Sequence, residues 1–431
     1  MAAEDLGHDN SDTNVNKPLP IRLLLLALAV ICVQAEASAQ KKLKLEKWQI
    51  DPYTNMEPKA MAKAGILNYG PFNFGNLAAD PVTSTDIQKT LPFINIIWME
   101  TAHFRIGVEL PEWSLPQDAR TKKKVRAELT ELKKKLPKIK PKSRKLAPWT
   151  RAHLTAHRLE KLYSDTQELF GVTDDDFPND PTEVFPGPGK TYMGYGKYMG
   201  MRDKFLVLVI NKGGPYRQYM EKYLGRPTFF AQRWHFTDSS SILFTCPVES
   251  NEFPLKHDTA LHCALAFNVG QNLLDGFRYY SYNLPVWIRE GFAHWNSRNI
   301  SGKWPSFDQN EGSIADMKRI DKWKPYTKAM ISGNKKFASF PEVAKWRDFG
   351  NLTFNDHVAI FSRIDYLMSM GPEKWRTFLF IVKGRVDEKW SINQKDLVGA
   401  TREGLKKAYN LSFLSFDDKW KAWVKKNYAS K

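Results

Sequence analysis

The most regular pattern of apolar residues lies between Asp258 and Gly276, in the sequence DTALHCALAFNVGQNLLDG. Apolar residues recur there at about every fourth position, which is the repeat of one face of an α-helix. Asp258 can cap the start of this helix, and Gly276 can end it. The residues of the apolar face are Leu261, Leu265, Val269 and Leu273. The pattern therefore predicts a buried helix.

A second, shorter helix is predicted in the sequence LPVWIREGFAHW, which begins at Leu284. Pro285 restricts the backbone and favours a turn before the helix begins. Glu290 and His294 are four residues apart, so their side chains lie on one face of this helix. Any chemistry that this helix contributes is expected on that face.

Three segments have the patterns of β-strands. Residues 104–108 alternate apolar with polar or small side chains, as expected for a strand with one buried face. The apolar run FLVLVI after Lys204 is typical of a central strand that is covered on both faces. The sequence SSILFTCPV, which begins at Ser240, predicts a third strand shortly before the buried helix.

The remaining periodic segments predict further helices, mostly towards the C-terminus. Thr150 is expected to cap one helix, and Ser415 with Asp418 resembles a capping box for the last one. The proline-containing stretch at residues 40–95 is expected to be an irregular wrap. The expected helices cover residues 120–136, 150–170, 216–224, 355–370, 372–384, 393–409 and 416–428. These elements together predict an α+β fold with a small mixed sheet and a helical C-terminal region.

The composition fits a folded globular protein, with 42% apolar residues and 14 tryptophans in 431 residues. The net charge of +17 is concentrated between Arg120 and Lys145, where thirteen basic residues face two acidic ones. This basic segment, which includes Lys133, Lys134 and Lys135, is either a solvated helix face or a surface for polyanions. A cell-wall polymer, an anionic lipid or a nucleic acid has the required charge. No nucleic-acid motif accompanies the segment, so recognition of bases is not expected.

The N-terminus has the features of an export signal. Arg22 precedes the apolar run LLLLALAVICV, and the sequence ASA at residues 37–39 offers small residues for cleavage after Ala39. The apolar run is short for a membrane span, although an uncleaved anchor is the alternative. We therefore expect a secreted or periplasmic protein without a transmembrane segment after signal removal.

Cleavage of the signal would remove Cys32 and leave two cysteines, Cys246 and Cys263. These two residues either form a disulfide or remain as buried free thiols. Cys263 would be a nucleophile only with a base within hydrogen-bond reach, and the sequence supplies none beside it. A packed thiol is the favoured interpretation.

The two helices around His262 and Glu290 resemble the active-site helices of the gluzincin zinc metallopeptidases. In that superfamily one helix carries H-E-x-x-H, and a later helix carries a glutamate in a context like L-P-x-W-x-x-E-G-x-A. The match places His262 at the first histidine and Glu290 at the third zinc ligand. The specific part of the resemblance covers residues 261–295, and a weaker likeness to secreted bacterial peptidase MA-like proteins covers about 97–430. In the family, a strand in the position of the third predicted strand flanks the cleft and pairs with an extended peptide.

Two departures from the family pattern decide the expected activity. The motif H-E-x-x-H is replaced by His262-Cys263-Ala264-Leu265-Ala266. Ala266 has no donor atom for a metal, and the thiol of Cys263 is a poor substitute for a carboxylate that shuttles protons. We therefore expect a protein that retains the metallopeptidase scaffold without its activity.

His262 itself has two interpretations. It is either a hydrogen-bonded histidine of the protein core or a remaining metal ligand. As a ligand it would need Glu290 and His294, and this two-histidine, one-carboxylate set would suit zinc or iron. No cofactor is required by the sequence, and zinc is the expected metal if one is bound.

Three classes of function follow. The first is a catalytically inactive gluzincin-like protein that binds or scaffolds a protein or anionic polymer at the cell envelope. The second is a variant metal-dependent hydrolase that uses His262, Glu290 and His294. The third is a polyanion-binding surface protein that uses the basic segment. The expected organisation is a signal peptide (1–39), the irregular wrap (40–95), a degenerate metallopeptidase-like domain (97–300) with a basic insertion (119–146), and a helical region (301–431).

Overall fold

The computed structural model describes residues 45–77, 81–180, 191–249, 255–306 and 319–430. The predicted export signal lies outside these residues. The chain divides into two units, Met1–Ile50 and Asp51–Lys431. The described part of the first unit contains one 3-10 helix, η1 (Lys47–Gln49). The proposed boundaries at residues 95 and 300 both fall within the second unit.

The described strands of the second unit form a five-stranded mixed sheet and a two-stranded pair. The strands are β1 (Ile97–Glu100), β2 (Phe104–Glu109), β3 (Trp113–Ser114), β4 (Lys145–Leu146), β5 (Phe205–Ile210), β6 (Gln232–Phe236) and β7 (Ser241–Pro247). The order in the larger sheet is β1-β2-β5-β7-β6. β2, β5 and β7 are parallel, whereas β1 and β6 run antiparallel to their neighbours.

About half of the described residues are helical and 11% have β-structure, so the predicted α+β class is confirmed at this coarse level. The helices before the chain's midpoint are α2 (Pro58–Ala64), α3 (Ser84–Thr90), α4 (Ala119–Lys135), α5 (Pro148–Phe170) and α6 (Gly213–Leu224). Those after it are α7 (Asp258–Gly276), α8 (Val286–Ile300), α10 (Trp323–Ser332), α11 (Phe340–Val343), α12 (Phe354–Met368), α13 (Pro372–Val382), α14 (Leu397–Tyr409) and α15 (Phe413–Asn427).

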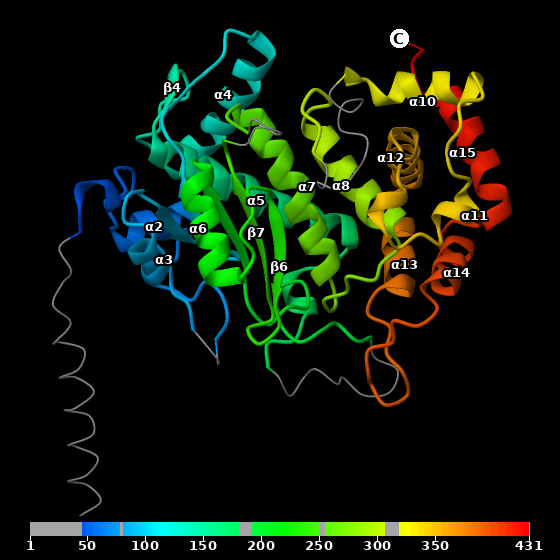
Figure 1. Cartoon of the computed structure of the whole chain (residues 1–431), viewed down its shortest axis with the longest axis horizontal. Helices are drawn as coiled ribbons and strands as arrows, with labels where there is room; N and C mark the ends of the chain where they lie inside the picture. Colours follow the sequence, from blue (N-terminus) through cyan, green and yellow to red (C-terminus); the bar gives the residue numbers. More distant parts are fainter. Residues whose placement is uncertain (1–44, 78–80, 181–190, 250–254, 307–318, 431) are drawn as a thin grey trace, which may run out of the picture. The chain divides into compact units, whose positions relative to one another are not determined.

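Helices cover both faces of the larger sheet (Figure 1). One face packs on α3 and α6, through a cluster that includes Leu206 and Leu208 of β5. The other face packs on α5 and α7, through a cluster that includes Val207 and Val209. Every side chain of β5 is therefore buried, which confirms the prediction of a central strand for this apolar run.

β7 is an inner strand of the sheet and not a free edge. Leu243 of β7 pairs with Leu206 of β5 on one side and with Trp234 of β6 on the other. Its backbone hydrogen-bonding groups are engaged by both neighbours, so β7 has no edge at which an extended peptide could add as a strand. The expectation that this strand pairs with a peptide was wrong, because the antiparallel strand β6 covers it.

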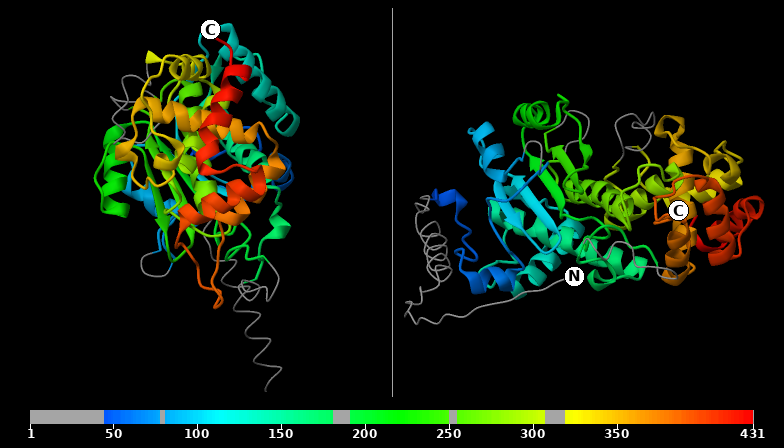
Figure 2. Two further views of the ribbon diagram at one scale, coloured as in Figure 1. Left: turned by 90° about the vertical axis from the view of Figure 1, so that its right-hand side faces the viewer. Right: turned by 90° about the horizontal axis from the view of Figure 1, so that it is seen from below.

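The C-terminal helices follow one another after the last strand and lie beside α8 (Figures 1 and 2). α12 contacts α8, α10, α13 and α15, so it occupies the centre of this group. Trp420 of α15 is fully buried, and its indole N–H donates to Ser362 of α12. α8 therefore packs on α7 at one side and on α12 at the other.

The main errors of the sequence predictions concern helix starts. α5 begins with Pro148, so Thr150 lies inside the helix, and α7 is capped by His257, not by Asp258. α15 is capped by Ser412, whose hydroxyl accepts from the backbone N–H of Ser415. α5 has no side-chain cap, because Ala147 precedes the proline at its first position, whereas neighbouring polar residues offered alternative caps for α7 and α15.

One further expectation needs correction. The segment at residues 40–95 contains the helices α2 and α3, so it is less irregular than expected. Residues 191–202 contain the buried side chains of Tyr192, Met199 and Met201. None of the described helices combines the length and apolarity that a membrane crossing requires.

Candidate functional site

α7 and α8 pack side by side in antiparallel directions. The thiol of Cys263 lies 3.7 Å from the carbonyl oxygen of Ser297, and the rings of Phe267 and His294 are 5.1 Å apart. One turn further along α7, the side-chain amide of Gln271 donates to Glu290 at 2.8 Å. Residues that follow one another at intervals of four along α7 therefore contact residues that lie about four positions earlier each time in α8.

This register separates His262 from Glu290. Glu290 lies opposite Gln271, which follows His262 by nine residues, or about 13 Å along a helix axis. The three donors of a zinc site lie about 2 Å from one ion, so these two residues cannot share one in this arrangement. The structure brings Glu290 and His294 together but leaves His262 apart, and the family's zinc site does not fit here.

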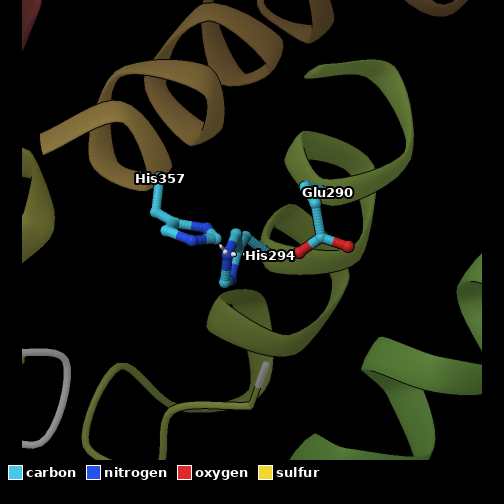
Figure 3. Close-up of side chains that lie close together, drawn as sticks. All are labelled: Glu290, His294 and His357. Carbon is cyan, nitrogen blue, oxygen red and sulfur yellow. Dashed lines mark hydrogen bonds and ion pairs between the residues drawn. The ribbon is translucent and has the colours of Figure 1, made fainter. Parts of the chain in front are cut away.

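Glu290 and His294 meet a third residue, His357 of α12 (Figure 3). His294 Nε2 lies 3.1 Å from His357 Nδ1 and 3.8 Å from Glu290 Oε2. One ligand atom from each of the three residues lies within 4.8 Å of the other two. In the part of the chain that the structure describes, this is the only group of three metal-binding side chains that lie so close together. We call this group the Glu-His-His cluster.

The Glu-His-His cluster is buried, with exposed fractions of 0% for Glu290, 2% for His294 and 0% for His357. Burial lowers the pKa of His357 to about 3. It also lowers the pKa of His294 well below its usual value, with further lowering by His357 and Arg298. Both imidazoles are therefore neutral at pH 7, the form in which histidine binds metals.

A glycine explains why α12 comes so close to α8. A Cβ atom on Gly291 would lie 2.5 Å from Ile364 Cγ1 and 3.0 Å from the carbonyl oxygen of Ile360. Only a residue without a side chain leaves room for α12 at this point. Gly291 follows Glu290 directly, so the close contact of the two helices places His357 beside Glu290 and His294.

His262 lies in a separate pocket between α5, α7 and α8, with a cavity volume of about 480 Å³. We call it the His262 pocket. Its walls are mostly apolar, from Leu162, Leu265 and Trp295, and Ala266 also lines it. Burial lowers the pKa of His262 well below its usual value, with smaller effects from Arg158 and Lys124. His262 is therefore a neutral polar group in a mostly apolar wall.

A buried ion cluster forms one side of the His262 pocket. Arg158 donates to both carboxylate oxygens of Glu128, at 2.9 and 2.7 Å, and to Asp258 at 2.7 Å. Glu128 also lies 3.7 Å from His262 Nδ1. Burial works against the charge of Arg158, but the two carboxylates outweigh it and raise its pKa. The cluster fixes α5 against α4 and α7, and so it defines the shape of the pocket.

Both cysteines are free and buried, which decides between the two alternatives left open by the sequence. Burial raises the pKa of each thiol to about 12. The thiol of Cys263 points at the carbonyl oxygens of Ser297 and Ser301, at 3.7 and 3.8 Å. A thiol in this environment stays protonated at pH 7 and is not an activated nucleophile.

The lysines of the basic segment face solvent. Val125, Leu129 and Leu132 of α4 are buried in a small apolar cluster, as their spacing predicts. Lys133, Lys134 and Lys135 form the last turn of α4 and are all exposed. Lys134 is paired with Glu131 at 2.6 Å.

Comparison of the chain with protein-family models, with curated proteins and with solved structures found no match. The resemblance to gluzincins therefore rests on the motif residues alone and stays a prediction. Sequence reasoning missed His357, although its position carries a signal. His357, Phe361 and Ile364 recur at spacings of four and three, so a histidine occupies the apolar stripe of α12.

Proposed function

We propose that this chain is a catalytically inactive, gluzincin-like binding protein of the cell envelope, and that the His262 pocket holds its ligand. One observation carries the proposal. His262 and Ala266, which stand where the family has its two metal-binding histidines, both line a mostly apolar pocket of about 480 Å³. This volume is in the range of pockets that bind small molecules.

The lining of the pocket indicates the chemistry of the ligand. Most of the wall is apolar, so the ligand has an apolar or aromatic body. Asn296 Nδ2 is buried at the pocket without a hydrogen-bond partner among the described residues. An unpaired buried donor is costly, and a ligand with a carbonyl or carboxylate oxygen would satisfy it. An amphipathic molecule with an apolar ring and an acceptor group fits both requirements.

A filled pocket is the first test. We expect the full chain to bind the fluorescent probe anilinonaphthalene sulfonate, and Ala266→Phe to weaken this binding at least about tenfold, because its phenyl ring would occupy the cavity. Ala266→Ser, which adds one oxygen, is the matched control and should bind almost as tightly as the wild type. The measurement is a fluorescence titration, with circular dichroism to compare the folds of the three proteins.

Two outcomes would contradict the proposal. Equal probe affinity for Ala266→Phe and the wild type would place the binding elsewhere. Chelator-sensitive cleavage of casein by the purified chain would show that the scaffold is still a peptidase.

The exposed basic turn of α4 supports polyanion binding as a second candidate function. The apolar side of α4 is buried, so the charges of Lys133, Lys134 and Lys135 are all presented to solvent. Neutralising exposed charges on a helix face weakens electrostatic attraction without removing core contacts. Exposed lysines are what both alternatives require, a polyanion-binding surface and a solvated helix face, so the experiment below has to separate them.

Replacement of Lys133, Lys134 and Lys135 by glutamine is expected to lower the salt concentration at which the protein elutes from dextran sulfate. If all three lysines contact the polymer, the slope of log retention against log salt should fall by about 2. The matched control replaces Lys419, Lys425 and Lys426, which are also exposed, and removes the same charge. Equal shifts for the two triple variants would mean that only the net charge matters.

A further inference from the structure

We infer that the Glu-His-His cluster is a structural metal site in which Glu290, His294 and His357 bind one divalent ion, with Zn²⁺ the best match, between α8 and α12. The three side chains come from two helices and converge on one point (Figure 3). The inference is independent of any ligand in the His262 pocket. The inferred site differs from the zinc site that the resemblance to gluzincins implies, because it uses His357 and excludes His262.

The distances between the donor atoms fit such an ion. Ligand atoms about 2 Å from a tetrahedral metal are about 3.3 Å from one another. His294 Nε2 lies 3.1 Å from His357 Nδ1 and 3.8 Å from Glu290 Oε2. A small movement of the carboxylate would place all three atoms around one centre. Two imidazole nitrogens and one carboxylate oxygen are common ligands of Zn²⁺.

Gln271 of α7 provides a second, independent observation. Its Nε2 donates to Glu290 Oε1 at 2.8 Å, which orients the carboxylate so that Oε2 faces His294. Such outer hydrogen bonds orient the ligands of metal sites. The Oε1 atom of Gln271 is buried and accepts no hydrogen bond from the residues that the structure describes.

Burial sets the role of the site. The three residues are at most 2% exposed and do not line the His262 pocket. Among the residues that the structure describes, these three are closed off from solvent, so an ion there would act on structure and not on catalysis. His294 and His357 are 63 residues apart in the chain. A shared ion would therefore tie the C-terminal helices to α8, and through α8 and α7 to the sheet.

The test uses the full chain, stripped with a chelator and then titrated with Co²⁺ and Zn²⁺. We expect one ion per chain, a visible Co²⁺ spectrum of tetrahedral type, and a melting temperature that rises with the free Zn²⁺ concentration. Loss of a residue that only hydrogen-bonds to a metal ligand costs about 10–100-fold in metal affinity. Loss of a ligand itself should cost more, so we expect His357→Gln and Glu290→Gln each to bind at least about 100-fold more weakly. The matched control, His262→Gln, should bind as the wild type does.

Several results would overturn the inference. These are no uptake of either ion by the wild type, undiminished affinity in His357→Gln, or loss of binding in His262→Gln. Should the ligand variants fail to fold, X-ray absorption of the zinc-loaded wild type decides the question. Two imidazole ligands would support the site, whereas one or none would refute it. None of these results bears on probe binding in the His262 pocket.

Discussion

Replacement of Asp275 by alanine is expected to lower the free energy of unfolding by about 3–5 kcal/mol. Asp275, at the end of α7, accepts two hydrogen bonds from Arg289 of α8, both at 3.0 Å, and one from Arg233 of β6 at 2.8 Å. The side chains of Arg289 and Asp275 are 1% and 2% exposed. Alanine would leave the guanidinium of Arg289 buried without its carboxylate, and this desolvated charge is the source of the large effect.

The measurement is urea denaturation followed by circular dichroism, at pH 7 and low salt. Glu403→Ala is the matched control, because Glu403 pairs with Lys407 at 2.6 Å on a surface where both side chains are more than half exposed. Exposed pairs of this spacing contribute about 0.3–0.5 kcal/mol, so the control should change stability little. Similar losses in the two variants would mean that Asp275 does not neutralise a buried charge.

Replacement of Gly291 by valine is expected to cost about 3 kcal/mol, at the upper end of the range for an overfilled core. The added Cβ atom would lie 3.0 Å from the backbone carbonyl oxygen of Ile360, which cannot rotate away, and 2.5 Å from Ile364 Cγ1. α8 and α12 would have to separate to accept it. The higher helix propensity of valine compared with glycine offsets only a few tenths of a kcal/mol.

Gly214→Val in α6 is the control for this substitution. Gly214 is also helical, but a Cβ atom there would meet no heavy atom within 4 Å. This variant should keep the wild-type stability or exceed it slightly, because glycine is the poorer helix former. Thermal and urea unfolding of both variants measure the difference. A tolerated valine at Gly291 would show that α12 does not need to approach α8 so closely.

The sequence predicted those elements whose character depends on local pattern. β5 was recognised because a short run of six apolar residues, four of them β-branched or aromatic, is typical of a strand that is covered on both faces. The ends of α5 and α6 were recognised because a glycine commonly ends a helix. In the structure, Gly171 and Gly225 do so in left-handed backbone conformations. The caps of α7 and α15 were assigned to the wrong residues, because their neighbours offered similar side chains.

The candidate site was predicted only in part. The spacing of Glu290 and His294 places them on one face of α8, and the structure brings them together. Their third partner depends on which helix packs against that face. The resemblance to gluzincins predicted that this partner is His262 of α7. In the structure, Gly291 allows α12 to approach α8, and the third residue is His357 of α12. His262 instead lines a pocket with Ala266.

The amino-acid sequence alone determined the mixed α/β composition, the central strand, the amphipathic helices and the paired face of Glu290 and His294. These features follow from the spacing of residues along one element. Only the tertiary structure decided that β6 covers β7, that Glu290 lies opposite Gln271, about 13 Å along α7 from His262, and that His357 completes the cluster. Those contacts depend on the register and packing of separate elements, and local periodicity does not specify the register.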